Sequence, residues 1–231
     1  MTLPDGVERR SLGGKGGLAT RGEPAYGEPT DGEWRRWDPR RSKLGAMLED
    51  GMETGLSGNE TVLYLGAAAG TTVGHVADFA GPTYAVEFAA RPARDLLDVA
   101  EPRENLFPLL KDARKPETYA HVVEPVEALI QDVATRGQAE VALANRRFLR
   151  EDGRLLLAIK ARSESRRGLR ADGGLPRRRL RDPRNRIARA VSRGPPRRRR
   201  AAEMKGPRVG VTRPRWGNRE SVSGRSRTYG I

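Results

Sequence analysis

Short apolar runs alternate with helix-like stretches between residues 57 and 164. The runs predict strands at VLYLG (62–66), TYAVEF (83–88), LFPLL (106–110), ALIQDV (128–133) and RLLLAIK (154–160). Between these runs, residues 71–79, 91–100 and 139–148 predict helices. Strands that alternate with helices are typical of an α/β fold with a parallel, doubly wound sheet, so we expect that class here.

The first 56 residues are rich in glycine and proline and contain only short possible strands. Near the end of this region a helix is predicted from Ser42, which is a good N-cap. Leu44, Met47 and Leu48 would form its apolar face. We therefore expect a separate N-terminal region that this helix joins to the sheet.

The alternation stops after Glu164. Residues 165–231 contain scattered apolar residues without a period, many Gly and Pro, and arginine runs at 177–179 and 197–200. Such a segment cannot bury enough apolar area to offset the entropy lost on ordering, so we expect a disordered tail.

Charge and composition narrow the possible functions. The net charge is +14, but residues 165–231 hold 21 Arg, one Lys and four acidic residues, so the rest of the chain is mildly acidic. There is no cysteine and only two histidines, which excludes thiolate and histidine-rich metal sites. No apolar run is long enough for a membrane span or a signal peptide, so we expect a cytoplasmic protein without a membrane partner.

Acidic residues follow three predicted strands. Glu87, Asp112 and Asp132 each lie where a strand ends, and LGAAAGTT (65–72) closes the first strand with small residues. In a parallel sheet these positions share the rim where nucleotide-like ligands bind, and an acid there commonly holds a ribose diol. Each feature alone has a plainer explanation, since Glu87 could be a surface acid and the turn could serve packing. Together they favour a nucleoside-containing ligand.

Two lysines are candidates for chemistry. Lys160 ends an apolar strand beside the same rim, and Lys43 begins the predicted linking helix, although either could be a solvated surface lysine. An ammonium group beside a carboxylate can ease the loss of a proton from a hydroxyl of high pKa. Trp34 and Trp37 could stack on RNA bases, but we favour core packing, and for His75 we favour a structural role.

These segments resemble archaeal fibrillarin, a family of RNA ribose 2′-O-methyltransferases. The resemblance is nearly continuous over residues 1–164. The segments that carry it are WDPRRSKLGAML (37–48), VLYLGAAAGTTVGHVADF (62–79), YAVEFAARPARDLL (84–97), LLKDARKPETY (109–119), QDVATRGQAE (131–140) and LLLAIKARS (155–163).

The resemblance implies a fold and a cofactor. It implies a small N-terminal β domain in residues 1–56 and an S-adenosylmethionine-dependent, Rossmann-like methyltransferase domain in 57–164. It assigns catalysis to Lys43, Asp132 and Lys160, which would orient and activate the 2′-OH. It assigns cofactor binding to Thr71, Thr72, Glu87, Phe88, Asp112, Ala113, Asp132, Val133, Ala134 and Thr135, with no metal.

The resemblance also implies partners. The family works on rRNA, and on tRNA in some cases, within box C/D guide ribonucleoproteins. These contain a guide RNA, a Nop-family scaffold protein and a kink-turn-binding protein.

The C-terminal segment departs from the family. The family has a catalytic histidine in a segment like P-F-x-x-D-H, and this chain has no histidine after His121. If the second and third bases of each codon are read with the first base of the next, the codons from Arg181 onward permit E-T-L-E-T-E-S-L-E-P-F-H-E-D-H. In that frame Met204 followed by Lys205 forces a stop codon. We therefore expect that a frameshift after about Glu164 replaced the family's C-terminus.

An alternative is that residues 165–231 are an authentic basic arm, which would make the chain a non-catalytic RNA-binding protein. If the frame is shifted, the missing elements should leave the strand that ends at Lys160 as an unpaired apolar edge. We then expect the chain with its present C-terminus to fold poorly and to be inactive.

Overall fold

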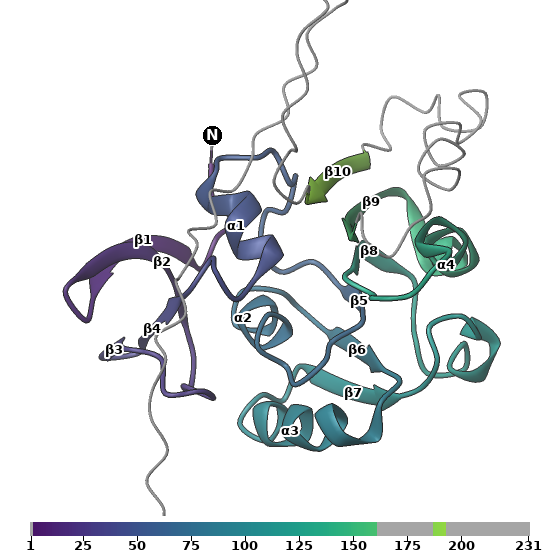
Figure 1. Ribbon diagram of the computed structural model, residues 1–231, viewed down its shortest axis with the longest axis horizontal. Helices are drawn as coiled ribbons and strands as arrows, with labels where there is room; N and C mark the ends of the chain where they lie inside the picture. The colour runs from purple at the N-terminus through teal and green to yellow at the C-terminus, as the bar shows by residue number, and fades with distance from the viewer. Residues whose placement is uncertain (1, 161–186, 193–231) are drawn as a thin grey trace, which may run out of the picture.

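The computed structural model describes residues 2–160 and 187–192, and for residues 159–160 and 187–192 it describes the backbone alone. These residues form two sheets, which stand next to each other in Figure 1. The N-terminal sheet is antiparallel, with strand order β1-β2-β4-β3. Its strands are β1 (Val7–Leu12), β2 (Lys15–Arg21), β3 (Thr30–Asp31) and β4 (Trp34–Trp37).

The second sheet is parallel and has the strand order β10-β9-β8-β5-β6-β7. Its strands are β5 (Val62–Leu65), β6 (Thr83–Glu87), β7 (Leu106–Leu110), β8 (Val126–Gln131), β9 (Leu149–Lys160) and β10 (Ile187–Ser192). The chain moves outward from β5 through β6 to β7, then returns to place β8 on the other side of β5. This reversal is a topological switch point, and ligands bind in such sheets outside the carboxyl ends of the strands at that point.

Helices connect and cover the strands. They are α1 (Lys43–Glu49), α2 (Val73–Ala77), α3 (Ala90–Ala100) and α4 (Gln138–Asn145), with short 3₁₀ turns η1 (Pro116–Thr118) and η2 (Arg146–Phe148). The Ser42 side chain accepts a hydrogen bond from the backbone N–H of Gly45, which confirms the predicted cap of α1. The helix predicted over residues 71–79 is shorter in the structure, where α2 begins at Val73 and ends at Ala77. No helix in the described part of the chain is long and apolar enough to cross a membrane.

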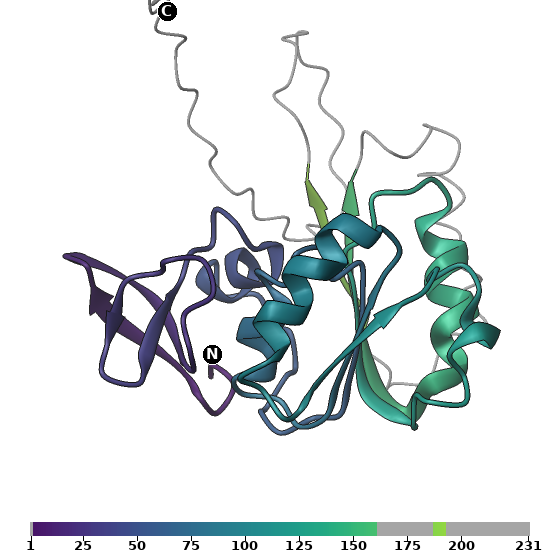
Figure 2. The ribbon, with the colours of Figure 1, turned by 90° about the horizontal axis from the view of Figure 1, so that it is seen from below.

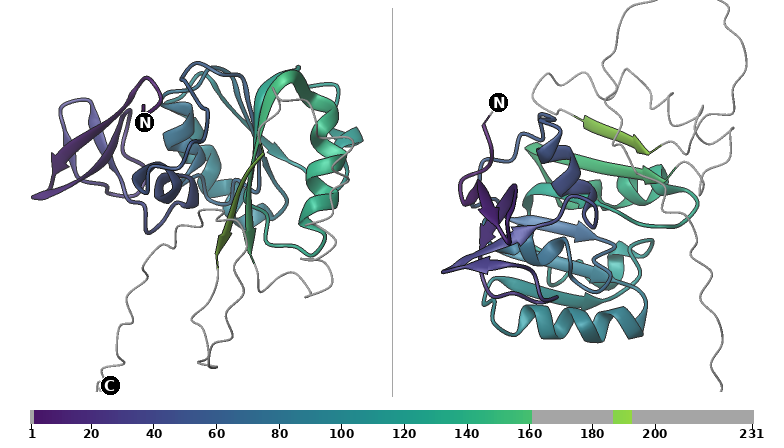
Figure 3. Two further views of the ribbon diagram at one scale, coloured as in Figure 1. Left: turned by 90° about the horizontal axis from the view of Figure 1, so that it is seen from above. Right: turned by 60° about the vertical axis from the view of Figure 1, so that its left-hand side comes forward.

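The parallel sheet is covered on both faces. Successive residues of β5 point to opposite sides, so Leu63 packs in the core under α4 and Tyr64 in the core under α2 and α3. Figure 2 shows the sheet between α4 on one side and the other helices on the opposite side, and the left view of Figure 3 shows the same layers from above. These layers confirm the predicted α/β class.

The two sheets share one hydrophobic core. Trp37 of β4 is buried, and its ring stacks on that of His75 in α2 with centroids 5.0 Å apart. Trp34 is also buried, so both tryptophans serve core packing, as predicted. Burial and the nearby guanidinium groups lower the pKa of His75 well below its usual range, which keeps this structural histidine neutral.

A buried charge cluster fastens this joint. The Asp78 carboxylate, which follows α2, accepts hydrogen bonds from Arg35 of β4 (2.7 Å), Arg103 (3.0 Å) and the Thr20 hydroxyl of β2 (2.6 Å). Arg35 also donates to Glu28 at 3.0 Å. The Asp78 side chain is 2% exposed and that of Arg35 1%, so the charges are compensated by one another and not by water.

The C-terminal segment differs from expectation in one place. Ile187–Ser192 forms β10 and pairs in parallel with β9, from Ile187 opposite Leu155 to Ser192 opposite Lys160. The edge of β9 is therefore paired and not open, which corrects that expectation. The short run IARAVS has enough apolar residues to add a strand to an apolar edge. The rest of the expected disordered tail lies outside the described residues.

Candidate active site

A cavity of about 420 Å³ lies at the carboxyl ends of β5, β6, β7 and β8. The predicted residues that line it are Glu87, Phe88, Asp112, Ala113, Asp132, Val133, Ala134 and Thr135. They come together because parallel strands end at one edge of the sheet. Gly66 and Ala68 of the predicted LGAAAGTT turn also line it, and sequence reasoning missed four further wall residues, which are Val86, Lys111, Arg114 and Val141.

Gly66 lets the end of β5 approach the loop after β8. Its φ of +83° lies in the left-handed region, and a Cβ added there would stand 2.7 Å from the carbonyl oxygen of Asp132. Only glycine fits this position without displacement. The glycine in LGAAAG could have signalled this approach, since small residues at a strand-to-helix turn are typical of it.

Glu87 joins two loops of the rim. Its carboxylate accepts hydrogen bonds from the backbone N–H groups of Ala68 (2.8 Å) and Ala89 (2.7 Å). Each carboxylate oxygen has two lone pairs, so both can still accept from a ligand's hydroxyl groups. The group is therefore both fixed in place and able to hold a diol.

Asp112 carries a defined charge at the end of β7. The Arg114 guanidinium donates to both carboxylate oxygens, with Nε–Oδ1 at 2.9 Å and Nη2–Oδ2 at 2.7 Å. These hydrogen bonds hold the pKa of Asp112 below its usual range. The Arg114 guanidinium also lies 5.8 Å from the ring centroid of Phe88, whose side chain is largely exposed at the rim.

Buried amides hold the loops that carry these residues. The Asn145 side chain in α4 donates to the backbone carbonyl oxygens of Ala113 (2.8 Å) and Val141 (2.9 Å), and it accepts a hydrogen bond from the Tyr119 hydroxyl. The Gln131 side chain donates to the carbonyl oxygen of Gln138 at 2.7 Å and so spans the loop that contains Asp132. Two cavity loops are therefore tied to α4.

Lys43 and Asp132 form an ion pair at this rim. The Lys43 ammonium, at the start of α1, donates to Oδ1 of Asp132, the residue that follows β8. The two side chains are 32% and 21% exposed, so the pair is partly desolvated but reachable from outside. Such a pair presents both a cation and a hydrogen-bond acceptor to a hydroxyl group.

Three of the expected site residues are placed differently or only in part. Lys160 ends β9, next to β8 in the sheet, but its side chain lies outside the described residues. Thr71 lines a second, smaller cavity and not the 420 Å³ one. Thr72, the N-cap residue of α2, lines neither cavity. Within residues 2–160, no group of three or more acidic or histidine side chains could hold a metal ion.

The chain is similar to known proteins over this whole site. The model of the family named Fibrillarin matches residues 18–167. A Haloarcula marismortui protein named fibrillarin-like rRNA/tRNA 2′-O-methyltransferase is 76% identical over 164 residues, which cover 71% of this chain and 78% of that protein. A Methanosarcina mazei protein of the same name is 55% identical over 149 residues, which cover 62% of this chain and 77% of that protein.

Solved structures agree. An Aeropyrum pernix fibrillarin crystallised with natively bound S-adenosyl-L-methionine is 38% identical, with a TM-score of 0.56 over 66% of this chain and 76% of that one. The fibrillarin of a fibrillarin/Nop5p complex is 40% identical, with a TM-score of 0.59 over 65% of this chain and 72% of that one. From the matched family model, the relatives and the cavity at the sheet's switch point together, it follows that the chain belongs to the fibrillarin family.

Proposed function

We propose that this chain transfers the methyl group of S-adenosylmethionine to the ribose 2′-OH of rRNA, and also of tRNA. The observation that carries the proposal is the Lys43–Asp132 ion pair, in which Asp132 lines the 420 Å³ cavity and Lys43 approaches it from the start of α1. The names of the relatives and the cofactor bound to the Aeropyrum pernix fibrillarin support it.

The cavity residues fit this cofactor. Glu87 offers acceptor oxygens for a ribose diol, Asp112 offers an ionised acceptor for an amino group, and Phe88 offers an aromatic face. The volume falls within the range of about 300–1,000 Å³ that is usual for small-molecule sites. When bound, S-adenosylmethionine supplies an electrophilic methyl group on a sulfonium.

The protein's own part is to prepare the hydroxyl. The Asp132 carboxylate accepts a hydrogen bond from the 2′-OH and orients its oxygen towards the methyl group. The Lys43 ammonium stabilises the negative charge that develops on that oxygen as its proton passes to the Asp132 carboxylate, which lowers the barrier for a group whose pKa is far above 7. The sulfur–methyl bond breaks as the oxygen–methyl bond forms, and positioning supplies much of the rate.

Further roles in this proposal depend on partners. A Nop-family scaffold protein is supported by the fibrillarin/Nop5p complex. We extend the proposal to a box C/D guide RNA that selects the target, to a kink-turn-binding protein, and to Lys160 as a third catalytic group. The assembled particle, and not this chain, would then determine which nucleotide is methylated.

Asp112→Ala should weaken S-adenosylmethionine binding about 10- to 100-fold, because a hydrogen bond to a charged group contributes roughly 1.5–3 kcal/mol. Because the pKa of Asp112 is held below its usual range, its carboxylate should stay ionised down to about pH 5, so we expect no loss of affinity through its protonation between about pH 7 and pH 5. Isothermal titration calorimetry measures both. The matched control is Asp152→Ala, which removes an exposed carboxylate from β9. Undiminished binding in Asp112→Ala would contradict the assignment.

The alternative is a non-catalytic RNA-binding protein in which residues 165–231 attach to phosphates. The abrupt end of similarity favours a different origin for this segment. The family model ends at residue 167, and the match of 76% identity over 164 residues leaves 22% of the Haloarcula marismortui protein unmatched. This agrees with a shifted reading frame after about Glu164.

A restored frame should therefore recover the family's C-terminus and raise activity. Resequencing the DNA around codons 160–206 should reveal one inserted or deleted base. A methyl-transfer assay with guide RNA and partner proteins then compares the two chains. An unchanged reading frame on resequencing would contradict the frameshift, and equal turnover from both chains would contradict the need for the missing segment. Equally tight RNA binding by a version that ends at Glu164 would contradict the basic-arm alternative.

A further inference from the structure

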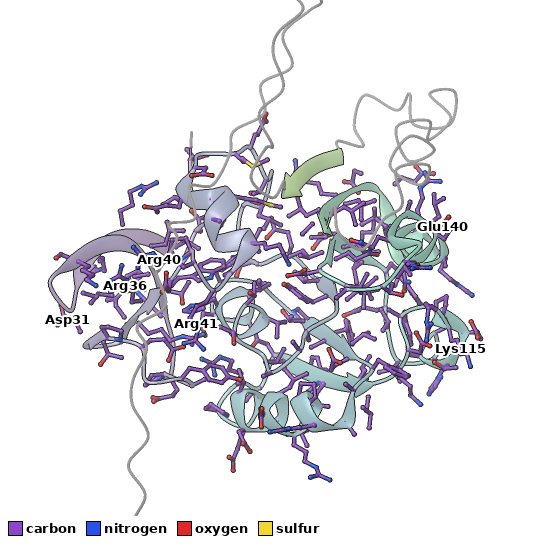
Figure 4. All side chains as sticks on the ribbon, viewed as in Figure 1. Asp31, Arg36, Arg40, Arg41, Lys115 and Glu140 are labelled. Carbon is purple, nitrogen blue, oxygen red and sulfur yellow. The ribbon has the colours of Figure 1, made fainter. Side chains whose placement is uncertain are left out.

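A second cavity, of about 210 Å³, lies where the N-terminal sheet meets the loop after β5. Four cationic side chains line it, namely Lys15 of β2, Arg36 of β4, and Arg40 and Arg41 in the loop before α1. In Figure 4 the three labelled arginines lie together on one side of the molecule, away from Lys115 and Glu140. We call this group the basic pocket.

The cations of the basic pocket have no acidic partners among residues 2–160. Some exposed arginines elsewhere do pair with a carboxylate, as Arg9 does with Glu49 and Arg150 with Glu127. By contrast, none of the four pocket cations pairs with a carboxylate in residues 2–160. The positive charge on this wall is therefore not offset by ion pairs within that part of the chain.

The two acidic residues on the wall are engaged elsewhere. The Glu28 carboxylate accepts from Arg35 at 3.0 Å and from the backbone N–H of Tyr26 at 2.7 Å. The Asp38 carboxylate accepts from the backbone N–H of Arg40 at 2.9 Å. The positive charge of the pocket therefore exceeds the negative charge, and an anion is the ligand that this arrangement favours.

The basic pocket is next to the reacting groups. Arg41 precedes Lys43 by two residues, so their Cα atoms are at most about 7 Å apart. Ser42 between them is buried and caps α1, which fixes the backbone of this segment at the start of the helix. Thr71, which also lines the basic pocket, belongs to the loop that continues from Gly66 and Ala68 of the cofactor cavity.

We propose that the basic pocket binds a backbone phosphate of the target RNA strand, beside the ribose that receives the methyl group. This inference rests on the proposed function, because it takes the Lys43–Asp132 pair as the place of the reacting 2′-OH. Every ribose in a strand is flanked by phosphates, so an anion site next to that pair lies on the path of the strand. Arginines suit phosphate because they donate in a fixed planar fork, and such contacts set the register of a strand without reading its sequence.

The test is the salt dependence of RNA binding by the full chain. For single strands, the slope of log K against log salt changes by about 0.7 for each phosphate contact. The double variant Arg40→Gln/Arg41→Gln, which removes the charge that holds this one phosphate, should therefore make the slope shallower by about 0.7 with a short, single-stranded RNA of mixed sequence. Arg40→Lys/Arg41→Lys should retain the parent slope, because it keeps both charges.

The matched control is Arg146→Gln/Arg147→Gln. It removes two adjacent exposed arginines from η2, which precedes the amino end of β9 and so lies at the opposite edge of the sheet. Its slope should equal that of the parent, and residues 165–231 contribute equally to all variants. An unchanged slope in Arg40→Gln/Arg41→Gln would overturn the proposal. So would an equal decrease of the slope in Arg40→Gln/Arg41→Gln and in the control Arg146→Gln/Arg147→Gln. Calorimetry with S-adenosylmethionine tests the proposed function separately, and there the pocket variants should bind as the parent does.

Discussion

Lys43→Ala should lower the rate of methyl transfer by about 10²–10³-fold, which is the usual cost of removing one group that stabilises developing charge. In the structure the Lys43 ammonium contacts the Asp132 carboxylate at the rim of the cofactor cavity. Without it, the 2′-OH would lose its proton with no nearby cation. S-adenosylmethionine affinity should change little, since Lys43 does not line that cavity.

Single-turnover assays with saturating cofactor, guide RNA and partner proteins measure this rate. Lys115→Ala is the control, because it removes an exposed ammonium that lies outside the cavity wall. A Lys43→Ala chain that methylates as fast as the parent, or that loses cofactor affinity in proportion to rate, would contradict the role given to Lys43.

The second large effect concerns stability. Asp78→Ala should lower the free energy of unfolding by about 3–5 kcal/mol, because it leaves the buried Arg103 guanidinium without its counter-charge and the buried Arg35 guanidinium with Glu28 alone. Since domains have only about 5–15 kcal/mol of stability, this loss should shift the urea midpoint strongly. It should also weaken the joint between the two sheets, where Arg35 and Asp78 meet.

Urea denaturation followed by tryptophan fluorescence suits this measurement, because Trp37 lies in the joint. Asp31→Ala is the matched control, since Asp31 is exposed on β3 and should cost little. A loss below about 1 kcal/mol for Asp78→Ala, as is typical of exposed ion pairs, would show that the cluster does not fasten the joint.

The sequence allowed the rim of the sheet to be predicted, because that part depends on a local pattern. Glu87, Asp112 and Asp132 each follow an apolar run, and parallel strands bring such positions to one edge. The cap at Ser42 was predictable for the same reason, since a capping side chain acts within its own turn.

Other features depend on contacts between distant segments. Nothing in the sequence pattern places Lys43 against Asp132, 89 positions later, and only the resemblance linked them. The Arg35–Asp78 contact spans 43 positions, and a charged residue in a polar segment is ordinarily expected at the surface. The resemblance assigned Thr71 to cofactor binding. In the structure, the turn after Gly66 places Thr71 on the wall of the basic pocket.

The position of β5 between β6 and β8 has a consequence for the order of folding. β5, α2 and β6 are close in sequence, so they can associate early, whereas Thr61 meets Glu127 of β8 across 66 positions. Closing that long loop costs more entropy and slows the step. Gly66 and Glu87 would then be assembled before Asp132 arrives, which makes docking of β8 the event that creates a methyl-transfer site. Quenching of protein fluorescence by bound cofactor during refolding should accordingly lag behind the protection of the β5–β6 backbone amides from hydrogen exchange.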